Sequence, residues 1–342
     1  MARRPTVADI AAACGLSVAT VDRVLNARLP VRQETAERVF KAAEQIGYHG
    51  TGLIRRRVEA GLPHYRLHIL LQRPDQLFYA DFARELERAA LSPTQFRVTA
   101  TISFLASQTP SEIANRLRDA ARTAQVIAMV AIDHPAVTAA VAEIEAAGIP
   151  VFALLSDFAS GVRRGYIGTD NTKVGRTAGW LVAHSAPPGK VAIFVGSHRF
   201  HGHELREIGF RSYLRQSAPH LTIIDTLVNL EDVNLAHEAT SDLLRRHPDL
   251  SAIYVAGGGM EGVVAALREE DMAGRLAVVC NEINAFSRAA LAENLITALT
   301  ATPVTAIGNA LVNLAATAMT TRTPESGGQT FLPFEIYVSE NI

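Results

Sequence analysis

The chain has 342 residues, of which 48% are hydrophobic and 20% are charged, and its formal net charge is -1. This length predicts two or three folding units, and the composition is that of an ordered globular protein rather than a disordered one. The N-terminal segment reaches Asp9 before any apolar run long enough for a signal peptide, and no stretch approaches the roughly 18 apolar residues of a membrane helix. We therefore expect a cytoplasmic protein without a membrane partner.

The charges are unevenly distributed along the chain. Residues 1–66 contain 11 Lys and Arg against 6 Asp and Glu, whereas the remaining residues contain 22 against 28. A basic N-terminal region on an acidic body indicates that this region alone meets a polyanion such as nucleic acid. Because a solvated charged face would give the same count, the motifs must decide between the two.

Residues 1–49 carry the signals of three short helices. Thr6 is a candidate cap for the first helix, and Gly15 permits the left-handed turn that ends it. Ser17 then caps a second helix, and a third is expected over about residues 34–46. Two short helices around a glycine turn, completed by a third, form the helix-turn-helix pattern, whose second helix enters the major groove of DNA. The alternative is a purely structural cap of three helices.

Two runs in this region, VADIAAACGLSVATVDRVLN and VRQETAERVFKAAEQIGY, are specific enough to identify a family. Residues 5–48 closely resemble the headpiece of the LacI/GalR repressors. Cys14, Leu16 and Asp22 depart from the usual residues of that family, and Asp22 introduces an anion beside the groove. The resemblance implies a transcriptional repressor whose partner is double-stranded operator DNA.

The resemblance also assigns roles to individual residues of the headpiece. Val18, Ala19 and Arg23 occupy the positions that read bases. Arg23 can make two hydrogen bonds to a guanine, whereas the two apolar side chains can only contact a thymine methyl. Contacts to DNA phosphates set the register of the protein on the duplex without reading its sequence. The resemblance assigns these contacts to Thr6, Ser17, Thr20 and Asn26, and Arg32 is a further candidate for a phosphate contact.

Residues 50–65 form the expected linker, in which glycines precede the triplet Arg55, Arg56 and Arg57. In the resembling family this segment is a hinge helix that folds on operator DNA and inserts a leucine into the minor groove. Arg57 stands at the position of that leucine, and each glycine disfavours a helix by about 1 kcal/mol. We therefore expect the arginines to bind the minor groove through their charge rather than to wedge it open.

From residue 66 to residue 342, apolar strand-like runs alternate with amphipathic segments. The runs are LHILLQ, RVTATISFL, VIAMVAID, PVFALLS, VAIFVG, LTIIDTLV, AIYVAG, LAVVCN and ITALTA. This alternation predicts an α/β fold with two doubly wound parallel sheets and a ligand site at the carboxyl ends of the strands. The interval GYIGTDNTKVG is expected to cross between lobes. The expected lobes cover about residues 66–168 with 301–325, and 169–300 with 326–342.

The order of these elements resembles the type I periplasmic sugar-binding fold that LacI/GalR proteins use as their sensor. That resemblance places Phe78, Tyr79, Asp133, Arg206 and Asn281 at sugar-contact positions. Aromatic rings cover a C–H face of a sugar, and the polar side chains pair with its hydroxyls, so the expected effector is a small sugar or polyol. Alternatively, Asp133 and Asn281 cap helices, Arg206 forms a surface ion pair, and the aromatic residues belong to the core.

Two further motifs suggest other functions. The run GGGMEG at residues 257–262, with Glu282 twenty residues later, matches the dinucleotide-binding fingerprint, but it follows a late strand and lacks a hydride-transfer constellation. A histidine-rich segment lacks the spacing of a helical metal pair; its members are His198, His201 and His203 with Glu204. We therefore expect no metal, no cofactor and no catalysis.

The remaining expectations concern partners. The body alone also fits a transport-associated sugar-binding protein, which the headpiece argues against. One short recognition helix reads too few bases by itself, so we expect a homodimer on a pseudo-palindromic operator. Cys14 and Cys280 lie far apart in sequence and are expected to be small buried hydrophobic residues.

Overall fold

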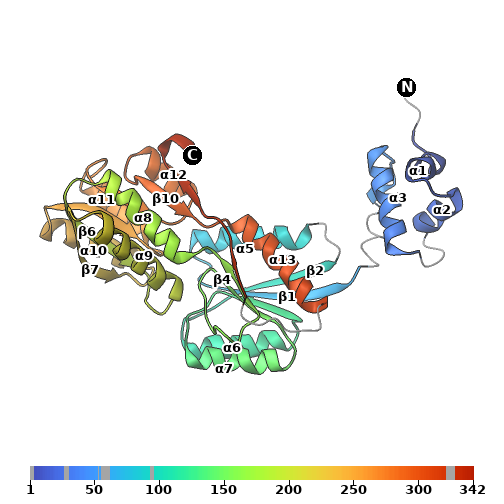
Figure 1. Ribbon diagram of the computed structural model, residues 1–342, viewed down its shortest axis with the longest axis horizontal. Coiled ribbons are helices and arrows are strands. Elements are labelled where there is room, and N and C mark those ends of the chain that lie inside the picture. Colours follow the sequence, from blue (N-terminus) through green and yellow to red (C-terminus); the bar gives the residue numbers. More distant parts are fainter. Residues whose placement is uncertain (1–3, 27–30, 53, 55–61, 93–95, 321–327) are drawn as a thin grey trace. The chain divides into compact units, whose positions relative to one another are not determined.

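The computed structural model describes residues 4–26, 31–52, 54, 62–92, 96–320 and 328–342 (Figure 1). The chain divides into two compact units, one comprising Met1–Tyr65 with Leu91–Thr99 and the other Arg66–Ala90 with Ala100–Ile342. Each unit is described separately. In the part of the chain so described, no helix is both long and apolar enough to cross a membrane.

The smaller unit contains the three expected helices, α1 (Val7–Cys14), α2 (Val18–Asn26) and α3 (Gln33–Gln45). Thr6 and Asp9 form a capping box at the start of α1, and Gly15 ends that helix in the left-handed conformation with φ 63°. The hydroxyl of Ser17 accepts a hydrogen bond from the backbone N–H of Thr20 at 3.1 Å, as expected of a cap. The helix-turn-helix prediction is confirmed.

The core of this unit extends beyond the three helices. Ile10, Val21, Val39 and Ala43 are fully buried in it, and so is Ile54. A helical turn follows α3, in which the N–H of Ile54 donates to the carbonyl of Gly50 at 3.2 Å. The linker expected from residue 50 therefore begins later, because burying an isoleucine side chain favours a helical turn by more than one glycine disfavours it.

The larger unit contains two six-stranded sheets, each of which orders its strands as a doubly wound fold does. In the first sheet the spatial order is β11 (Gly328–Phe331), β5 (Gly165–Gly168), β4 (Val151–Leu154), β3 (Val126–Met129), β1 (His64–Leu71) and β2 (Arg97–Phe104). In the second sheet it is β12 (Glu335–Tyr337), β10 (Ala298–Ala301), β9 (Ala277–Cys280), β8 (Leu250–Val255), β6 (Gly189–Val195) and β7 (Leu221–Val228). The described pairs are parallel except β10 with β12, which confirms the expected fold class.

Helices cover both faces of each sheet (Figure 1). The first lobe carries α5 (Leu77–Leu91), α6 (Pro110–Ala121), α7 (Pro135–Ala146) and α13 (Val304–Thr320). The second lobe carries α8 (Asn171–Ser185) and α9 (His201–Ser217) on one face, and α10 (Val233–Arg246), α11 (Met260–Glu269) and α12 (Ala285–Ala292) on the other. Helices α8 and α9 pack closely because Gly175, Gly179 and Gly209 present no side chain to the opposite helix.

The chain crosses between the lobes after β5, after β10 and after β11. The third crossing differs from the expected lobe boundary at residue 326, because β11 pairs with β5 and so belongs to the first lobe. The run Gly328–Phe331 is short and half polar, which is why its sequence did not indicate a strand. The interval GYIGTDNTKVG likewise begins with strand β5 before the chain crosses.

Candidate functional site

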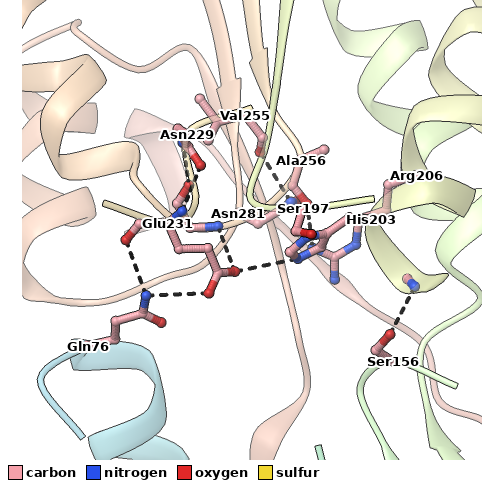
Figure 2. A network of polar contacts seen from close by, with 12 residues as sticks. Gln76, Ser156, Ser197, His203, Arg206, Asn229, Glu231, Val255, Ala256 and Asn281 are labelled. Carbon is pink, nitrogen blue, oxygen red and sulfur yellow. Dashed lines mark hydrogen bonds and ion pairs between the residues drawn. The ribbon is translucent and has the colours of Figure 1, made fainter. Parts of the chain in front are cut away.

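A cavity of about 230 Å³ opens where the carboxyl ends of the strands of the two lobes face each other. The first lobe lines it with the segment after β1 and with Leu155 and Ser156 after β4. The second lobe lines it with the first turns of α8 and α9 and with the segments after β7, β8 and β9. Gly202 at the start of α9 donates its N–H to the hydroxyl of Ser156 at 3.0 Å, so the lobes are in contact beside the cavity (Figure 2).

Arg206 is the cation at the centre of the site. Its Nε donates to Oδ1 of Asn171 at 2.7 Å, and its Nη1 donates to the carbonyl of Ala256 at 3.1 Å. Nη2 lies 3.9 Å from a carboxylate oxygen of Glu282. Only 11% of the Arg206 side chain is exposed, and these contacts fix the position of the guanidinium in the wall of the cavity.

Glu282 provides the acceptor next to this guanidinium. Its carboxylate accepts hydrogen bonds from the backbone N–H and the hydroxyl of Thr302, at 2.5 and 2.6 Å. Burial raises the pKa of Glu282, although the charge of Arg206 and the bonds from Thr302 oppose the increase. Arg206 and Glu282 thus offer donors and acceptors side by side, the combination that sugar hydroxyls require.

Glu231 is a second buried carboxylate, placed by the turn between β7 and α10. Figure 2 shows it between Gln76 of the first lobe and His203 of α9. Its oxygens accept from Nε2 of Gln76 and from the backbone N–H of Gly258, both at 3.4 Å, and lie 3.6 Å from Nε2 of His203. Burial raises the pKa of Glu231.

His203 is a neutral member of this cluster. Burial, aided by the positive charge of Arg206, lowers the pKa of His203 to about 3. At neutral pH its imidazole therefore carries no charge, and it contributes hydrogen-bonding atoms to the cavity rather than a counter-charge for Glu231.

One wall of the cavity is aromatic. Phe78 and Tyr79 lie in the first turn of α5 and both line the cavity. The ring of Phe78 meets that of Tyr79 edge-on at 5.2 Å and stacks on Phe82 at 5.9 Å. Tyr79 is buried, so it belongs to the core of the lobe as well as to the cavity wall.

Four of the five effector residues expected from the sequence therefore meet at one cavity: Phe78, Tyr79, Arg206 and Asn281. The side chain of Asn281 is already engaged, because it accepts from the hydroxyl of Thr300 at 2.5 Å and donates to the carbonyl of Val255 at 3.3 Å. Asp133 does not line the cavity. It is exposed and accepts from the N–H of Ala159 at 3.1 Å, since β3 ends at Met129 and the chain has left the strand by that point.

The alternative roles considered for these residues, as helix caps or as a surface ion pair, can be compared with the structure. Helices α7 and α12 are capped by His134 and Asn284, not by Asp133 and Asn281. Arg206 is largely buried, and its side chain contacts Asn171, Ala256 and Glu282 at the cavity rather than a partner on the surface. Among the residues that sequence reasoning did not assign to the effector site are Gln76, Asn171 and Glu231, together with Glu282, which was noticed only as part of a dinucleotide motif. Asn171 and Glu282 lie within three residues of a strand end, which was the available signal, whereas Gln76 lies five residues after β1 and Glu231 lies in a turn that no local pattern marks.

Packing accounts for the glycine run after β8. A Cβ on Gly257 would lie 2.8 Å from the His203 ring, one on Gly258 would lie 3.0 Å from Glu231, and one on Gly262 would lie 2.0 Å from the carbonyl of Val233. These positions exclude side chains because other parts of the second lobe already occupy the space. The glycines are explained without a bound dinucleotide.

The histidine-rich segment does not converge on one point. His198 faces Glu207 at 3.0 Å, His201 faces Glu204 at 3.3 Å, and His203 faces Glu231. Within the described ranges, no group of three or more His, Cys, Asp and Glu side chains could hold a metal ion.

The headpiece presents a second candidate surface, on α2. Val18 is 51% exposed, and Ala19 and Arg23 are also exposed, whereas Val21 and Val24 are buried. The proposed base-reading residues therefore share the free face of this helix.

The proposed phosphate-binding residues have local partners in the free headpiece. The hydroxyls of Ser17 and Thr20 lie 2.8 Å apart, and the hydroxyl of Thr6 donates to the carboxylate of Asp9 at 2.7 Å. Arg32 is exposed just before α3. The arginines at 55–57 lie outside the described residues, so their role stays a prediction.

Known protein families match both units of the chain. Residues 74–323 match the family described as periplasmic binding protein domain, and residues 6–50 match the one described as bacterial regulatory proteins, lacI family. An uncharacterized HTH-type transcriptional regulator of Streptomyces limosus is 28% identical over 62% of this chain and 58% of its own length. The HTH-type transcriptional regulator GalR of Lacticaseibacillus casei is 32% identical over 32% of this chain and 33% of its own length. The chain thus spans less than two thirds of these relatives.

Solved structures share the fold of the larger unit. A solute binding protein of an ABC transporter from Agrobacterium vitis, bound with alpha-D-tagatopyranose, has a TM-score of 0.73 at 20% identity, covering 81% of this chain and 95% of its own. The arabinose binding protein AraP of Geobacillus stearothermophilus has a TM-score of 0.67 at 20% identity, covering 82% of this chain and 98% of its own. At this identity the likeness establishes the fold alone.

Proposed function

The chain belongs to the periplasmic binding protein domain family and matches the lacI family of bacterial regulatory proteins over residues 6–50, and from that premise we propose that a small sugar or polyol controls its repression of transcription. The headpiece binds operator DNA, and the cavity between the lobes binds the effector. No catalytic step is part of this function.

The proposal that the cavity binds a sugar or polyol rests on one observation: Arg206 and Glu282 lie side by side in a cavity that also has an aromatic wall. A guanidinium edge and a carboxylate supply donors and acceptors for neighbouring hydroxyls, and the rings of Phe78 and Tyr79 cover a C–H face. The strand ends of both lobes line this cavity. A ligand bound there contacts both lobes and therefore favours their closed arrangement over an open one.

The exposed face of α2 supports the proposal that the headpiece binds DNA. Arg23 is the one long donor among its three proposed base-reading residues and can make two hydrogen bonds to a guanine. A single such helix covers only a few base pairs, so we propose a homodimer that reads two half-sites of a pseudo-palindrome. The larger unit supplies the surface for that dimer, and the cytoplasm is the proposed location.

Selection of DNA from a random duplex library by the purified full-length chain tests this function. We expect enrichment of a pseudo-palindrome, and weaker enrichment with relaxed sequence preference by the Arg23→Ala variant. A screen of sugars and polyols by thermal unfolding then identifies effectors, because a ligand that binds only the native state raises the unfolding temperature. An effector found in this way should change the affinity for the selected site. A chain that binds sugars but enriches no DNA motif would instead support a sugar-binding protein of the transport class.

A further inference from the structure

We propose that the effector carries an ammonium group that pairs with Glu231, so that its chemical class is an amino sugar or an amino polyol. This inference rests on the proposed function and names the ligand of the same cavity.

The cavity contains more acidic than basic side chains. Four carboxylates and two guanidinium groups line it: Asp75, Glu231, Glu261, Glu282, Arg73 and Arg206. Arg73 pairs with Asp75 at 3.0 Å, and Arg206 lies 3.9 Å from Glu282. Within the described part of the chain, no Lys or Arg side chain forms an ion pair with Glu231.

Among the described residues, the groups that contact Glu231 are neutral and lie at long range, whereas the charges of Arg73 and Arg206 lower its pKa without forming an ion pair with it. Its donors from Gln76 and Gly258 lie at 3.4 Å, and Nε2 of the uncharged His203 lies at 3.6 Å. These distances are at or beyond the limit of a good hydrogen bond. A carboxylate can accept about four hydrogen bonds, so Glu231 keeps acceptor capacity toward the cavity. A buried carboxylate with no cation in direct contact is costly, and a cationic ligand in contact with it reduces that cost.

The backbone holds Glu231 in this place at the expense of local strain. Leu230 and Glu231 both have left-handed φ angles, of 52° and 57°, although neither is a glycine. Asn229 supports the turn, because its Oδ1 accepts from the N–H of Glu231 at 2.9 Å and its Nδ2 donates to the carbonyl of Gly258 at 2.8 Å. Strained non-glycine residues held in this way gather at ligand-binding sites.

Two glycines in neighbouring segments leave space for the side chain of Glu231. A Cβ on Gly196 would lie 2.4 Å from Cγ of Glu231, and a Cβ on Gly258 would lie 3.0 Å from its Cβ. The turn, the two glycines and the amide of Gln76 therefore converge on one carboxylate with which no Lys or Arg of the described residues forms an ion pair. An ammonium group brings the charge and up to three N–H donors, while the hydroxyls of the same molecule pair with Arg206 and Glu282.

Isothermal titration calorimetry on the full chain at pH 6.5 tests the inference with matched probes. The probes are aminodeoxyhexoses and 1-amino-1-deoxyalditols, each beside its hydroxyl parent and its N-acetyl derivative. We expect at least one amine to bind ten-fold or more tightly than both of its neutral partners. In Glu231→Gln this ratio should fall to about one, whereas Glu238→Gln, which changes an exposed carboxyl of α10, should keep it.

The outcomes separate the inference from the proposed function. Neutral parents that bind as tightly as their amines would overturn the inference and leave the sugar-controlled regulator standing. Binding of no probe at all would count against both. An amine preference that survives in Glu231→Gln would place the ammonium group elsewhere and also overturn the inference. Because the comparison of amine and parent uses the unaltered protein, it decides the question even where the Glu231→Gln variant does not fold.

Discussion

The side-chain amide of Asn26 donates a hydrogen bond of 2.6 Å to the carboxylate of Asp22, one turn earlier on α2. Asn26 is a proposed phosphate contact, and Asp22 stands where the resembling repressors usually have a serine. In the free headpiece the carboxylate therefore orients the amide and also places a negative charge beside the surface proposed to meet DNA. These two effects can be separated by substitution.

Replacing Asp22 should strengthen binding to random duplex DNA. Asp22→Asn and Asp22→Ser both remove the charge that repels phosphates, and each should tighten non-specific binding several-fold at low salt, as fluorescence anisotropy would measure. Only Asp22→Asn keeps a group that can hold the amide of Asn26. If orientation matters more than charge, only the serine variant will differ from the unaltered protein.

Arg23→Ala should cost about 1 to 3 kcal/mol of binding free energy on the selected operator and much less on random DNA, because a contact to a base edge discriminates between sequences. Competition binding with both DNAs measures the two losses. Lys41→Ala, which removes an exposed cation from α3, is the matched control and should not change the ratio of the two affinities. Equal losses on both DNAs would make Arg23 a phosphate contact.

Arg206→Ala should abolish the response to the effector and leave operator binding nearly intact, because Arg206 lies in the larger unit and lines the cavity. Arg206→Lys keeps the charge but cannot reproduce the bonds to both Asn171 and Ala256, so its response should be weak. Arg215→Ala, on the exposed side of the same helix, should respond normally. Gel-shift titrations with the effector measure all three. A normal response in Arg206→Ala would remove Arg206 from the site.

The pKa of His203, lowered to about 3, predicts a specific pH dependence of stability. Below pH 6.5 the unfolded chain binds a proton at this residue that the native state does not bind, so its contribution to stability falls as the pH decreases. The slope is at most about 1.4 kcal/mol per pH unit. Glu231 and Glu282 act in the opposite direction, because their pKa values are raised in the native state.

The variant His203→Gln isolates the contribution of His203 to the pH dependence of stability. The free energy of unfolding of the unaltered chain, minus that of His203→Gln, should decrease between pH 6.5 and pH 4.5 in urea titrations. A difference that stays constant over this range would mean that His203 is protonated in the native state as readily as in the unfolded chain.

The part of the candidate site that could be predicted from the sequence came from the family resemblance. Arg206, Phe78 and Tyr79 were found lining the cavity where the family resemblance put them, although their contact with an effector stays a prediction. Asp133 was not, because β3 ends four residues before it. Glu231 was missed because its position depends on a strained turn, and neither a period nor a motif marks such a turn.

The sequence by itself determined the headpiece and the α/β architecture. Caps, a left-handed glycine and the helical and strand periods are local signals, and each acts within a few residues of the chain. The tertiary structure alone decided that β11 joins the first sheet, that Ile54 enters the headpiece core, and that Glu231 meets Gln76 from the other lobe. These contacts join segments that are distant in sequence, and their energy depends on burial and on facing partners that no local pattern records.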